Sequence, residues 1–373
     1  MRPKIVIVGG GLAGLTNAIL LAKADFEVTL IERKTYPFHR VCGEYISNEV
    51  LPFFKEIGIN PDDFGAAKIS KLIISAPNGK ELTSNLDLGA FGISRLVLDN
   101  ELYKIASALG VIFILGQKVL DIRFNEEKFE IELPTHTLMA DLVIGAFGKR
   151  SNIDQKLKRP FFYKRSPYVG VKYQIKTDFA TDTIQLDNFK GGYCGISKIE
   201  SDLYCLCYLA ENKYLKQYGS IQLMEEQIVR KNPNLNKIFN SSEFVWTQPE
   251  TINEISFDKK TLVENHILMC GDTAGMIAPL CGNGMAIAIH SAKILSQIII
   301  QECNLGINPQ KRIDIENAYQ SRWKKEFDIR LMIGRGIQKV FGNEGLTNYS
   351  IAGLKLFPQI ITKIVKKTHG KPF

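Results

Sequence analysis

The stretch KIVIVGGGLAGLTNAILLAKADFEVTLIE at residues 4–32 decides the fold of this chain. Lys4–Val8 and Val28–Ile31 are short apolar runs of the kind found in buried strands, and Leu15–Lys23 between them has the apolar spacing of a helix. A G-x-G-x-x-G motif joins the first run to the helix, and Glu32 closes the second run. This order of strand, glycine turn, helix, strand and terminal acid predicts a βαβ unit that binds a dinucleotide.

Each glycine of the motif has its own role in this prediction. Gly9 permits the tight turn, Gly11 lets the backbone approach a pyrophosphate, and Gly14 lets the helix pack closely on the strand. We expect the phosphates at the start of the helix, because its first N–H groups are unpaired and its dipole favours anions. The carboxylate of Glu32 is expected to bind ribose hydroxyls.

The composition is typical of a globular chain of one large domain or two interleaved ones. Of its 373 residues 45% are hydrophobic, and no uncharged apolar run reaches the roughly 20 residues that span a bilayer. The start imitates a secretory signal, but three glycines interrupt its apolar region, so we do not expect cleavage. Lysines and arginines give a net charge of +8 and are spread along the chain without an aromatic-rich basic stripe. Nucleic acid is therefore not an expected partner.

The seven cysteines are odd in number and scattered, which favours free thiols and a cytoplasmic location. Cys205 and Cys207 alternate within an apolar run and have no Cys/His pair at zinc spacing. A buried strand is therefore expected there, and no metal site.

The other runs predict an α/β architecture. Val111–Leu115, Leu142–Ala146 and His266–Met269 have the character of parallel strands, whereas residues 168–210 alternate as antiparallel strands do. We expect a doubly wound, Rossmann-like domain interleaved with an antiparallel β-sheet domain and followed by a helical C-terminus. The expected segments are residues 1–70, 96–165 and 255–310 for the first domain, 71–95 and 166–254 for the second, and 311–373 for the helices.

A second motif lies far along the chain, where an apolar run delivers Gly271-Asp272 into a turn that continues to Pro279 and Gly282–Met285. The carboxylate of Asp272 is placed to accept hydrogen bonds from sugar-alcohol hydroxyls. The amides of the second turn are placed to stabilise negative charge on a carbonyl. A simple strand–turn–helix connection with a capping aspartate is the alternative.

Together these motifs, with Arg40 and Arg95 between them, resemble the FAD-dependent family that includes p-hydroxybenzoate hydroxylase and geranylgeranyl reductases. The resemblance covers nearly the whole chain and implies FAD as the cofactor. It places the adenosine ribose at Glu32, the ribityl chain and pyrophosphate region at Asp272, and the isoalloxazine ring along residues 279–285. The residues expected to bind the cofactor are Gly9, Gly11, Leu12, Ala13, Gly14, Glu32, Arg33, Arg40, Arg95, Gly271, Asp272, Pro279, Gly282, Asn283, Gly284 and Met285.

The segment Tyr36–Glu44 resembles the P-x-x-[KR]-x-C-G segment of the reductases, but two other family motifs are altered. Phe147 replaces the acid of a D-G motif, which weakens the expectation that NAD(P)H is the electron donor. The Y-x-W-x-F-P signature of the reductases is reduced to Tyr193–Lys198, without its tryptophan. The tryptophan-rich signature of flavin-dependent halogenases is absent too, so a halogenase is not expected.

Three functions are considered, and the sequence favours the first over the other two. The first is an NAD(P)H-dependent monooxygenase acting on an apolar or aromatic small molecule, which the Gly282–Met285 turn favours. The second is a reductase of carbon–carbon double bonds, which the Cys42 segment favours, and the third is a non-catalytic flavin-binding protein. No general acid or base stands out, because the flavin supplies the chemistry. His290 is expected to be a core histidine.

Two further expectations concern the substrate and the C-terminus. An apolar substrate is expected on the sheet that contains Tyr168–Ile175 and Leu203–Leu209, with the hydroxyls of its tyrosines as polar contacts; the alternative is that these side chains only fill the core. Ile351–Val365, with the lysines that follow, either contacts an anionic membrane at its periphery or covers the FAD domain, and the sequence favours the cover. The oligomeric state is not predicted.

Overall fold

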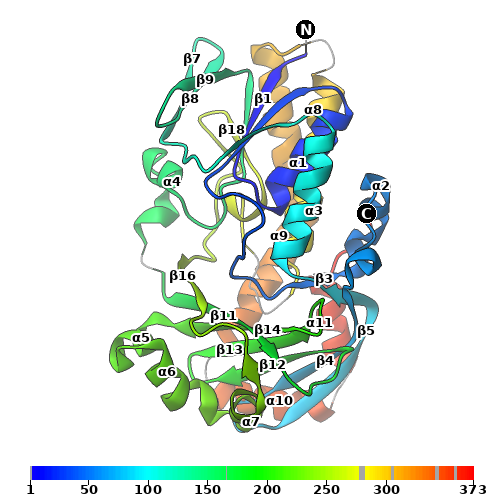
Figure 1. The fold of residues 1–373 in the computed structure, drawn as a ribbon, viewed down its shortest axis with the longest axis vertical. Coiled ribbons are helices and arrows are strands. Elements are labelled where there is room, and N and C mark those ends of the chain that lie inside the picture. Colours follow the sequence, from blue (N-terminus) through cyan, green and yellow to red (C-terminus); the bar gives the residue numbers. More distant parts are fainter. Residues whose placement is uncertain (1, 165, 277–281, 304–305, 341–343, 357–358) are drawn as a thin grey trace.

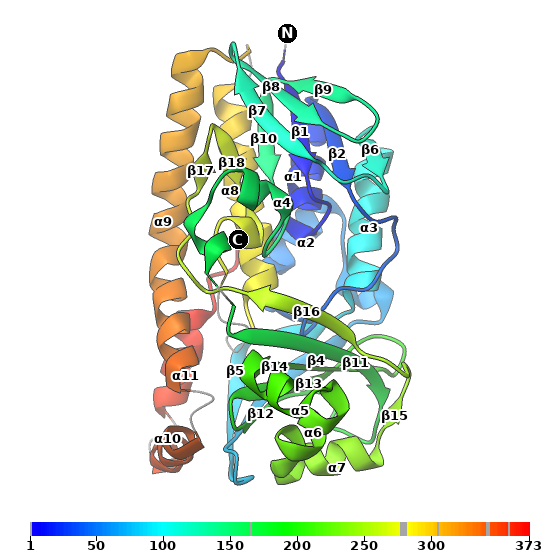
Figure 2. The ribbon, with the colours of Figure 1, turned by 90° about the vertical axis from the view of Figure 1, so that its left-hand side faces the viewer.

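A parallel sheet and a larger, mostly antiparallel sheet lie at opposite ends of the molecule, and a long helix runs beside both (Figures 1 and 2). The computed structural model describes residues 2–373 except 165, 277–281, 304–305, 341–343 and 357–358. The α/β class, the interleaving of the two sheets along the chain and the helical C-terminus are confirmed.

The first sheet contains the βαβ unit that the opening motif predicts. Across it the strands are β17 (Val263–Glu264), β18 (Ile267–Met269), β10 (Leu142–Gly145), β1 (Lys4–Val8), β2 (Glu27–Glu32) and β6 (Ile112–Leu115). Neighbours are parallel except β17, which is antiparallel to β18. Strands of such a sheet are apolar throughout because both faces are covered.

Helices cover one face of this sheet and a small sheet covers the other (Figure 2). The helices are α1 (Leu12–Lys23), α3 (Arg95–Ala108) and α8 (Gly284–Glu302), and the small sheet consists of β7 (Asp121–Asn125), β8 (Lys128–Glu132) and β9 (Thr137–Ala140). By length and composition α8 is a candidate membrane span, but 67% of that stretch is buried inside the protein. It is therefore the core helix of this end of the molecule.

The second sheet holds the strands expected between residues 168 and 210. Across it lie β15 (Glu243–Phe244), β11 (Tyr168–Lys176), β14 (Tyr204–Glu211), β13 (Gly192–Lys198), β12 (Thr183–Phe189), β4 (Ala67–Ser75), β5 (Glu81–Gly92) and β3 (Tyr45–Ser47), with β16 (Glu250–Ile255) also on β11. Cys205 and Cys207 lie in β14, as predicted.

The strands between residues 168 and 210 pair antiparallel with one another, as predicted, whereas β12 also pairs parallel with β4. These two strands come from different segments of the chain, so no hairpin dictates their relative direction. The expected boundary at residue 70 also falls inside β4, and β3 joins this sheet from a segment that we had given to the first domain.

Helices cover both sides of the second sheet. The cluster α5 (Asn212–Tyr218), α6 (Ile221–Gln227) and α7 (Pro233–Ser241) packs on one side, while α10 (Glu344–Leu356) and α11 (Gln359–Thr368) pack against β5. Ile351 and Ile361 are buried beside Ala76 and Leu82. The C-terminal helices therefore cover the second sheet, and not the FAD domain as the sequence had favoured. Two short helices, α2 (Leu51–Ile57) and α4 (Asn152–Lys156), complete the fold.

The long helix α9 (Pro309–Val340) is fastened to the rest of the chain by a buried ion pair. The guanidinium of Arg330 donates to both carboxylate oxygens of Glu49 at 3.0 and 3.2 Å, and to the carbonyl oxygen of Thr368 at 3.2 Å. The C-terminal Phe373 donates its N–H to the carbonyl oxygen of Glu49. One pair of charges thus joins α9, the segment before α2 and the C-terminal end.

Replacing Arg330 with methionine should lower the free energy of unfolding by about 3–5 kcal/mol, because it leaves the fully buried carboxylate of Glu49 without its partner. The matched control is Lys366→Met, which breaks an exposed pair with Asp87 and should cost about 0–1 kcal/mol. Urea unfolding measures both. Equal effects of the two substitutions would contradict this role of the buried pair.

Candidate functional site

The glycine turn after β1 is shaped so closely that side chains are excluded from it. Gly9 has φ of +106°, and a Cβ there would lie 2.3 Å from the carbonyl oxygen of Ala146. A Cβ on Gly14 would lie 1.9 Å from the carbonyl oxygen of Gly9, so this glycine allows α1 to approach the turn. Gly11 precedes α1, whose first N–H groups lack helical partners and face the cavity at Leu12 and Ala13.

The carboxylate of Glu32, at the end of β2, organises this turn. Its Oε2 accepts hydrogen bonds from the N–H of Gly10 at 2.8 Å and from the guanidinium of Arg40 at 3.1 Å. Its Oε1 accepts from the N–H of Lys34 at 3.1 Å. The side chain is only 5% exposed, yet it lines the cavity, which is the placement that recognition of a ribose needs.

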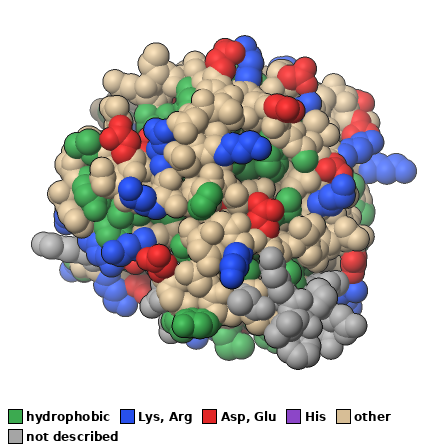
Figure 3. Space-filling view, turned by 90° about the horizontal axis from the view of Figure 1, so that it is seen from below, with side chains coloured by type: hydrophobic (Ala, Val, Ile, Leu, Met, Phe, Trp, Pro, Cys, Tyr) green, Lys and Arg blue, Asp and Glu red, His purple; other side chains and the backbone are tan. Residues whose placement is uncertain are grey.

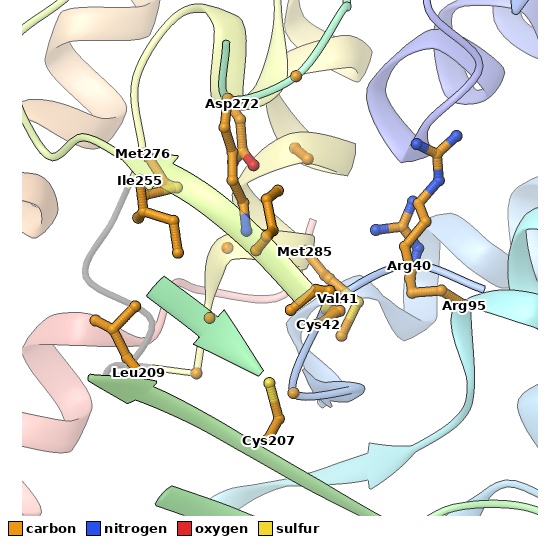
Figure 4. A pocket seen from close by; sticks show the side chains of 18 of the residues that line it. Arg40, Val41, Cys42, Arg95, Cys207, Leu209, Ile255, Asp272, Met276 and Met285 are labelled. Atoms are coloured by element: carbon orange, nitrogen blue, oxygen red, sulfur yellow. The ribbon is translucent and has the colours of Figure 1, made fainter. Parts of the chain in front are cut away.

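Two arginines meet on one carboxylate beside the glycine turn. Arg95 donates two hydrogen bonds of 2.7 Å to Asp99, and Arg40 donates one of 3.0 Å to the same carboxylate. Figure 4 shows both guanidinium groups together on one side of the cavity, and the side chain of Arg95 reaches the space next to Gly11. Positive charge is thus held where a pyrophosphate would meet the start of α1.

The second motif lies across the cavity from these arginines (Figure 4). Gly271–Thr273 form a 3₁₀ turn directly after β18, and Asp272 lines the cavity. Two cations that the sequence had not singled out, the partly buried Lys260 and the buried Arg159, hold this turn. Lys260 donates to the carbonyl oxygens of Asp272 and Lys149 at 2.8 Å each, and Arg159 donates to that of Thr273 at 3.0 Å. Burial lowers the pKa of Lys260 to about 8.

The turn that leads into α8 faces both the cavity and the C-terminal helices. Gly282 has φ of +68°, and a Cβ there would lie 2.8 Å from the ring of Tyr45. Gly284 and Met285 line the cavity, whereas the amide of Asn283 donates to the carbonyl oxygen of Thr368 at the end of α11. Asn283 therefore ties this turn to the C-terminus.

All these groups surround one cavity of about 1230 Å³, more than the roughly 300–1000 Å³ of a pocket for one small ligand. Gly14 and Asn283 support its wall without lining it, and Pro279 lies outside the described residues. The predicted residues that line it are Gly9, Gly11, Leu12, Ala13, Glu32, Arg33, Arg40, Arg95, Gly271, Asp272, Gly282, Gly284 and Met285.

The cavity continues from this polar cleft into a chamber between the second sheet and the C-terminal helices. The carboxylate of Glu250 and the amide of Asn253, on the strand β16 that also carries Ile252 and Ile255, line the cavity. Among the described residues the rest of the lining of this chamber is mostly aliphatic, with a few hydroxyls and one imidazole. It comprises Leu72, Ile74, Leu86, Ile184, Leu186, Tyr193, Gly195, Ser197, Leu209, Ile252, Ile255, Met276, Ile337, Thr347, Tyr349, Ser350, Ile351, Gly353, Leu354, Ile361, Ile364, Val365, Thr368 and His369.

Only part of the sheet expected to hold a substrate faces this chamber. Tyr193 of β13 lines it, but the hydroxyls of Tyr173 and Tyr208 donate to Glu225 of α6 on the other side of the sheet. The interpretation that tyrosines fill the core is thus right for Tyr173, which does not line the cavity. Tyr193, the first residue of the altered Tyr193–Lys198 signature, is the tyrosine that faces the chamber.

A buried ion pair that the sequence analysis missed joins the cofactor side to the sheet. The ammonium group of Lys172 in β11 donates to Glu44 and, at 3.3 Å, to the carbonyl oxygen of Arg40. Both side chains are fully buried, and the carboxylate keeps the pKa of Lys172 above its usual value despite burial. A lysine between Val171 and Tyr173 in this strand was the available sequence signal.

Tyr45 and His369 form a hydrogen-bonded pair where the cleft meets the chamber. His369 uses Nδ1 to donate to the carbonyl oxygen of Val365 at 2.9 Å, and the hydroxyl of Tyr45 lies 3.2 Å from its Nε2. Burial lowers the pKa of His369, so the imidazole is neutral and Nε2 accepts from the hydroxyl. Both side chains line the cavity. His290, in contrast, stacks on Phe373 away from the cavity, as expected of a core histidine.

No group of three or more potential metal ligands occurs among the residues that the structure describes. Burial raises the pKa of Cys207 to about 12, so this cavity-lining thiol stays protonated. Phe147 and Lys149, in the altered D-G motif, both line the cavity, as does Arg150, whose guanidinium lies 4.0 Å from the ring centre of Phe162.

Comparison with known proteins gives one family match that covers most of the chain. The model of the "FAD binding domain" family matches residues 2–314. Digeranylgeranylglycerophospholipid reductase 2 of Methanopyrus kandleri is 27% identical over 98% of this chain and 93% of its own length. The 6-hydroxy-3-succinoylpyridine 3-monooxygenase HspB of Pseudomonas putida is 24% identical over 88% of this chain and 86% of its own length.

Solved structures with the same fold include the flavin-dependent halogenase CmlS. It superposes with a TM-score of 0.77 at 19% identity over 89% of this chain, and the chain spans 64% of the length of that halogenase. At this identity the likeness concerns the fold alone.

Replacing Glu32 or Asp272 with alanine should each weaken FAD binding about ten- to hundredfold, because each removes charge-assisted hydrogen bonds of about 1.5–3 kcal/mol. Titration of the apoprotein with FAD, followed by flavin fluorescence, measures the dissociation constants. Glu27→Ala is the matched control, since this carboxylate also lies in β2 but forms an exposed pair with Lys4. Wild-type affinity in both site variants would refute the assigned roles.

Proposed function

Because the chain belongs to the FAD binding domain family and is thus a flavin-dependent oxidoreductase, we propose that it reduces carbon–carbon double bonds in a long apolar substrate. The observation that carries this proposal is the aliphatic chamber that continues from the dinucleotide cleft. An aromatic substrate with ionised groups would meet mostly aliphatic side chains there, with the carboxylate of Glu250 on β16 as a charged group of the lining. An isoprenoid-like chain would bury its whole length there.

The residues of the cleft fit FAD. The glycine turn leaves no room for side chains, Glu32 is buried yet faces the cavity, and the paired arginines stand beside the start of α1. FAD, when bound, supplies two-electron redox chemistry. The chain itself contributes positioning: the chamber orients the substrate and excludes water, and Lys260 and Arg159 fix the turn that carries Asp272.

Reduction of a double bond adds a hydride to one carbon and a proton to the other, so the site needs a proton donor. Tyr45 is the candidate, because its hydroxyl lies at the junction of cleft and chamber. His369 accepts from this hydroxyl and holds it in place. Burial raises the pKa of Tyr45, so the hydroxyl keeps its proton until a strongly basic carbon centre needs it.

The electron donor proposed for this reaction is NAD(P)H. Lys149 and the exposed Arg33 place positive charge in the cavity wall, which suits the phosphates of a nicotinamide dinucleotide. Phe147, in place of the acid of the family motif, remains an argument against direct reduction. Stopped-flow reduction of the bound flavin by NADH and by NADPH tests this part separately.

Oxygenation of the same apolar substrate is the second candidate. It is favoured by the Gly282–Met285 turn, which resembles that of the hydroxylases, and by the altered Tyr193–Lys198 signature. The experiment that separates the two candidates incubates the FAD-loaded protein with NAD(P)H and polyunsaturated isoprenoid lipids, with and without oxygen. A product that gains two hydrogen atoms supports reduction, whereas one that gains an oxygen atom overturns it in favour of oxygenation. No turnover with any donor would favour a flavin-binding protein without catalysis.

Tyr45→Phe removes the candidate donor while it keeps the ring that packs on Gly282. We expect turnover to fall about 10²–10⁴-fold, the usual contribution of a general acid. The rate of flavin reduction and the affinity for FAD should stay as in the wild type, which distinguishes loss of a proton donor from loss of the site. Unchanged turnover would show that the proton comes from another group.

Gly195→Trp restores a large side chain at the position of the missing family tryptophan. The new ring should fill the chamber beside Leu186 and abolish turnover of long substrates, while the protein still binds FAD. Gly195→Ala is the matched control: its Cβ would lie 3.3 Å from Leu186, a contact that a small shift relieves. If long substrates react normally in the tryptophan variant, the chamber does not hold them.

A further inference from the structure

Most of the highly exposed apolar side chains of the described chain belong to two consecutive helices, α9 and α10. Four of the five large hydrophobic residues with the highest exposed fractions lie between residues 329 and 349. They are Ile329 (65%) and Met332 (61%) on α9 and Leu346 (54%) and Tyr349 (82%) on α10, which we call the α9–α10 surface. The two residues of each helix are three positions apart and so lie on one helix face. Grouped apolar exposure of this kind marks an interaction surface, unlike the single exposed residues found on any protein.

The α9–α10 surface adjoins an opening of the aliphatic chamber. Tyr349 belongs to both, since it is largely exposed and also lines the cavity, and its neighbours Thr347 and Ser350 line the cavity too. The described apolar residues Ile351 and Ile361 of the C-terminal helices instead point inward. A molecule that leaves the α9–α10 surface can therefore enter the chamber at α10.

The charge of the chain is concentrated in the same region. Residues 321–373 contain 11 lysines and arginines but only 3 aspartates and glutamates, so they hold the whole net charge of +8, and residues 1–320 are balanced. Arg330 and Lys366 are paired with Glu49 and Asp87, while Lys325 and Lys367 are exposed. Figure 3 views the molecule from the end that carries α10 and shows apolar, basic and acidic side chains interspersed on that face.

We propose that the α9–α10 surface docks on an anionic lipid bilayer, from which the apolar substrate enters the chamber at α10. The inference rests on the proposed function for the nature of the substrate. A bilayer fits both properties of the surface, since apolar side chains insert among acyl chains and lysines attract anionic headgroups. A second copy of this chain would bring the same excess of positive charge to the contact, which opposes pairing through this end.

Vesicle flotation tests the proposal on the FAD-loaded full chain. Wild-type protein should float with vesicles of phosphatidylcholine and phosphatidylglycerol at low salt, and far less with phosphatidylcholine alone or at high salt. The triple variant Ile329→Gln/Met332→Gln/Tyr349→Gln should lower the partition coefficient about tenfold or more. Glutamine is chosen because it is polar and favours helices.

The chain offers a control matched residue by residue. Ile112, Met139 and Tyr163 are exposed by 53%, 53% and 64% outside the α9–α10 surface, and their triple change to glutamine should leave flotation unchanged. Flavin content and thermal unfolding confirm that both variants are folded. If wild-type protein fails to float at low salt, or if both variants lose flotation equally, the proposal is overturned.

Light scattering provides a further test. A wild-type dimer that the α9–α10 variant dissociates would assign the surface to a second copy and overturn the lipid proposal. Flotation requires no turnover, and turnover of detergent-dispersed substrate requires no bilayer. The failure of this inference is therefore distinguishable from failure of the proposed function.

Discussion

The buried ion pair between Glu44 and Lys172 is the contact on which the site depends. It connects β11 of the second sheet to the segment that carries Arg40, and Arg40 in turn contacts both Glu32 and Asp99. One continuous set of charged contacts thus runs from the substrate side to the nucleotide side. Loss of either partner would leave an uncompensated charge in a place without water, a large penalty that keeps the two halves in a fixed arrangement.

The features that depend on local sequence patterns were predicted correctly from the sequence. The βαβ unit, the order of the two motifs and the positions of most strands follow from periodicity and from glycine spacing, and thirteen of the sixteen predicted residues line one cavity. The direction of β12 beside β4 did not follow, because pairing between distant segments depends on the whole fold. The roles of Lys172, Lys260 and Arg159 were missed for a similar reason: the role of such a cation is intelligible only when its partners are known.

The C-terminal helices make the substrate space and the cofactor space parts of one structure. They form a wall of the chamber, and through Asn283 and Tyr45 they contact the turn that the family resemblance places along the flavin ring. The helix α9 runs beside both sheets and so spans both parts (Figure 2). A chain truncated before α10 would keep the nucleotide motifs but lose a wall of the chamber.

The uneven distribution of charge has a consequence for motion in solution. The whole net charge of +8 belongs to residues 321–373, which include α10 and α11, so the net charge is distributed unevenly over the molecule. Near any strongly anionic surface such a molecule experiences a torque before contact, and it turns the end that carries α10 toward the surface. The protein is then oriented while it still diffuses, so that its first contact with the anionic surface is made by the end that carries the chamber opening.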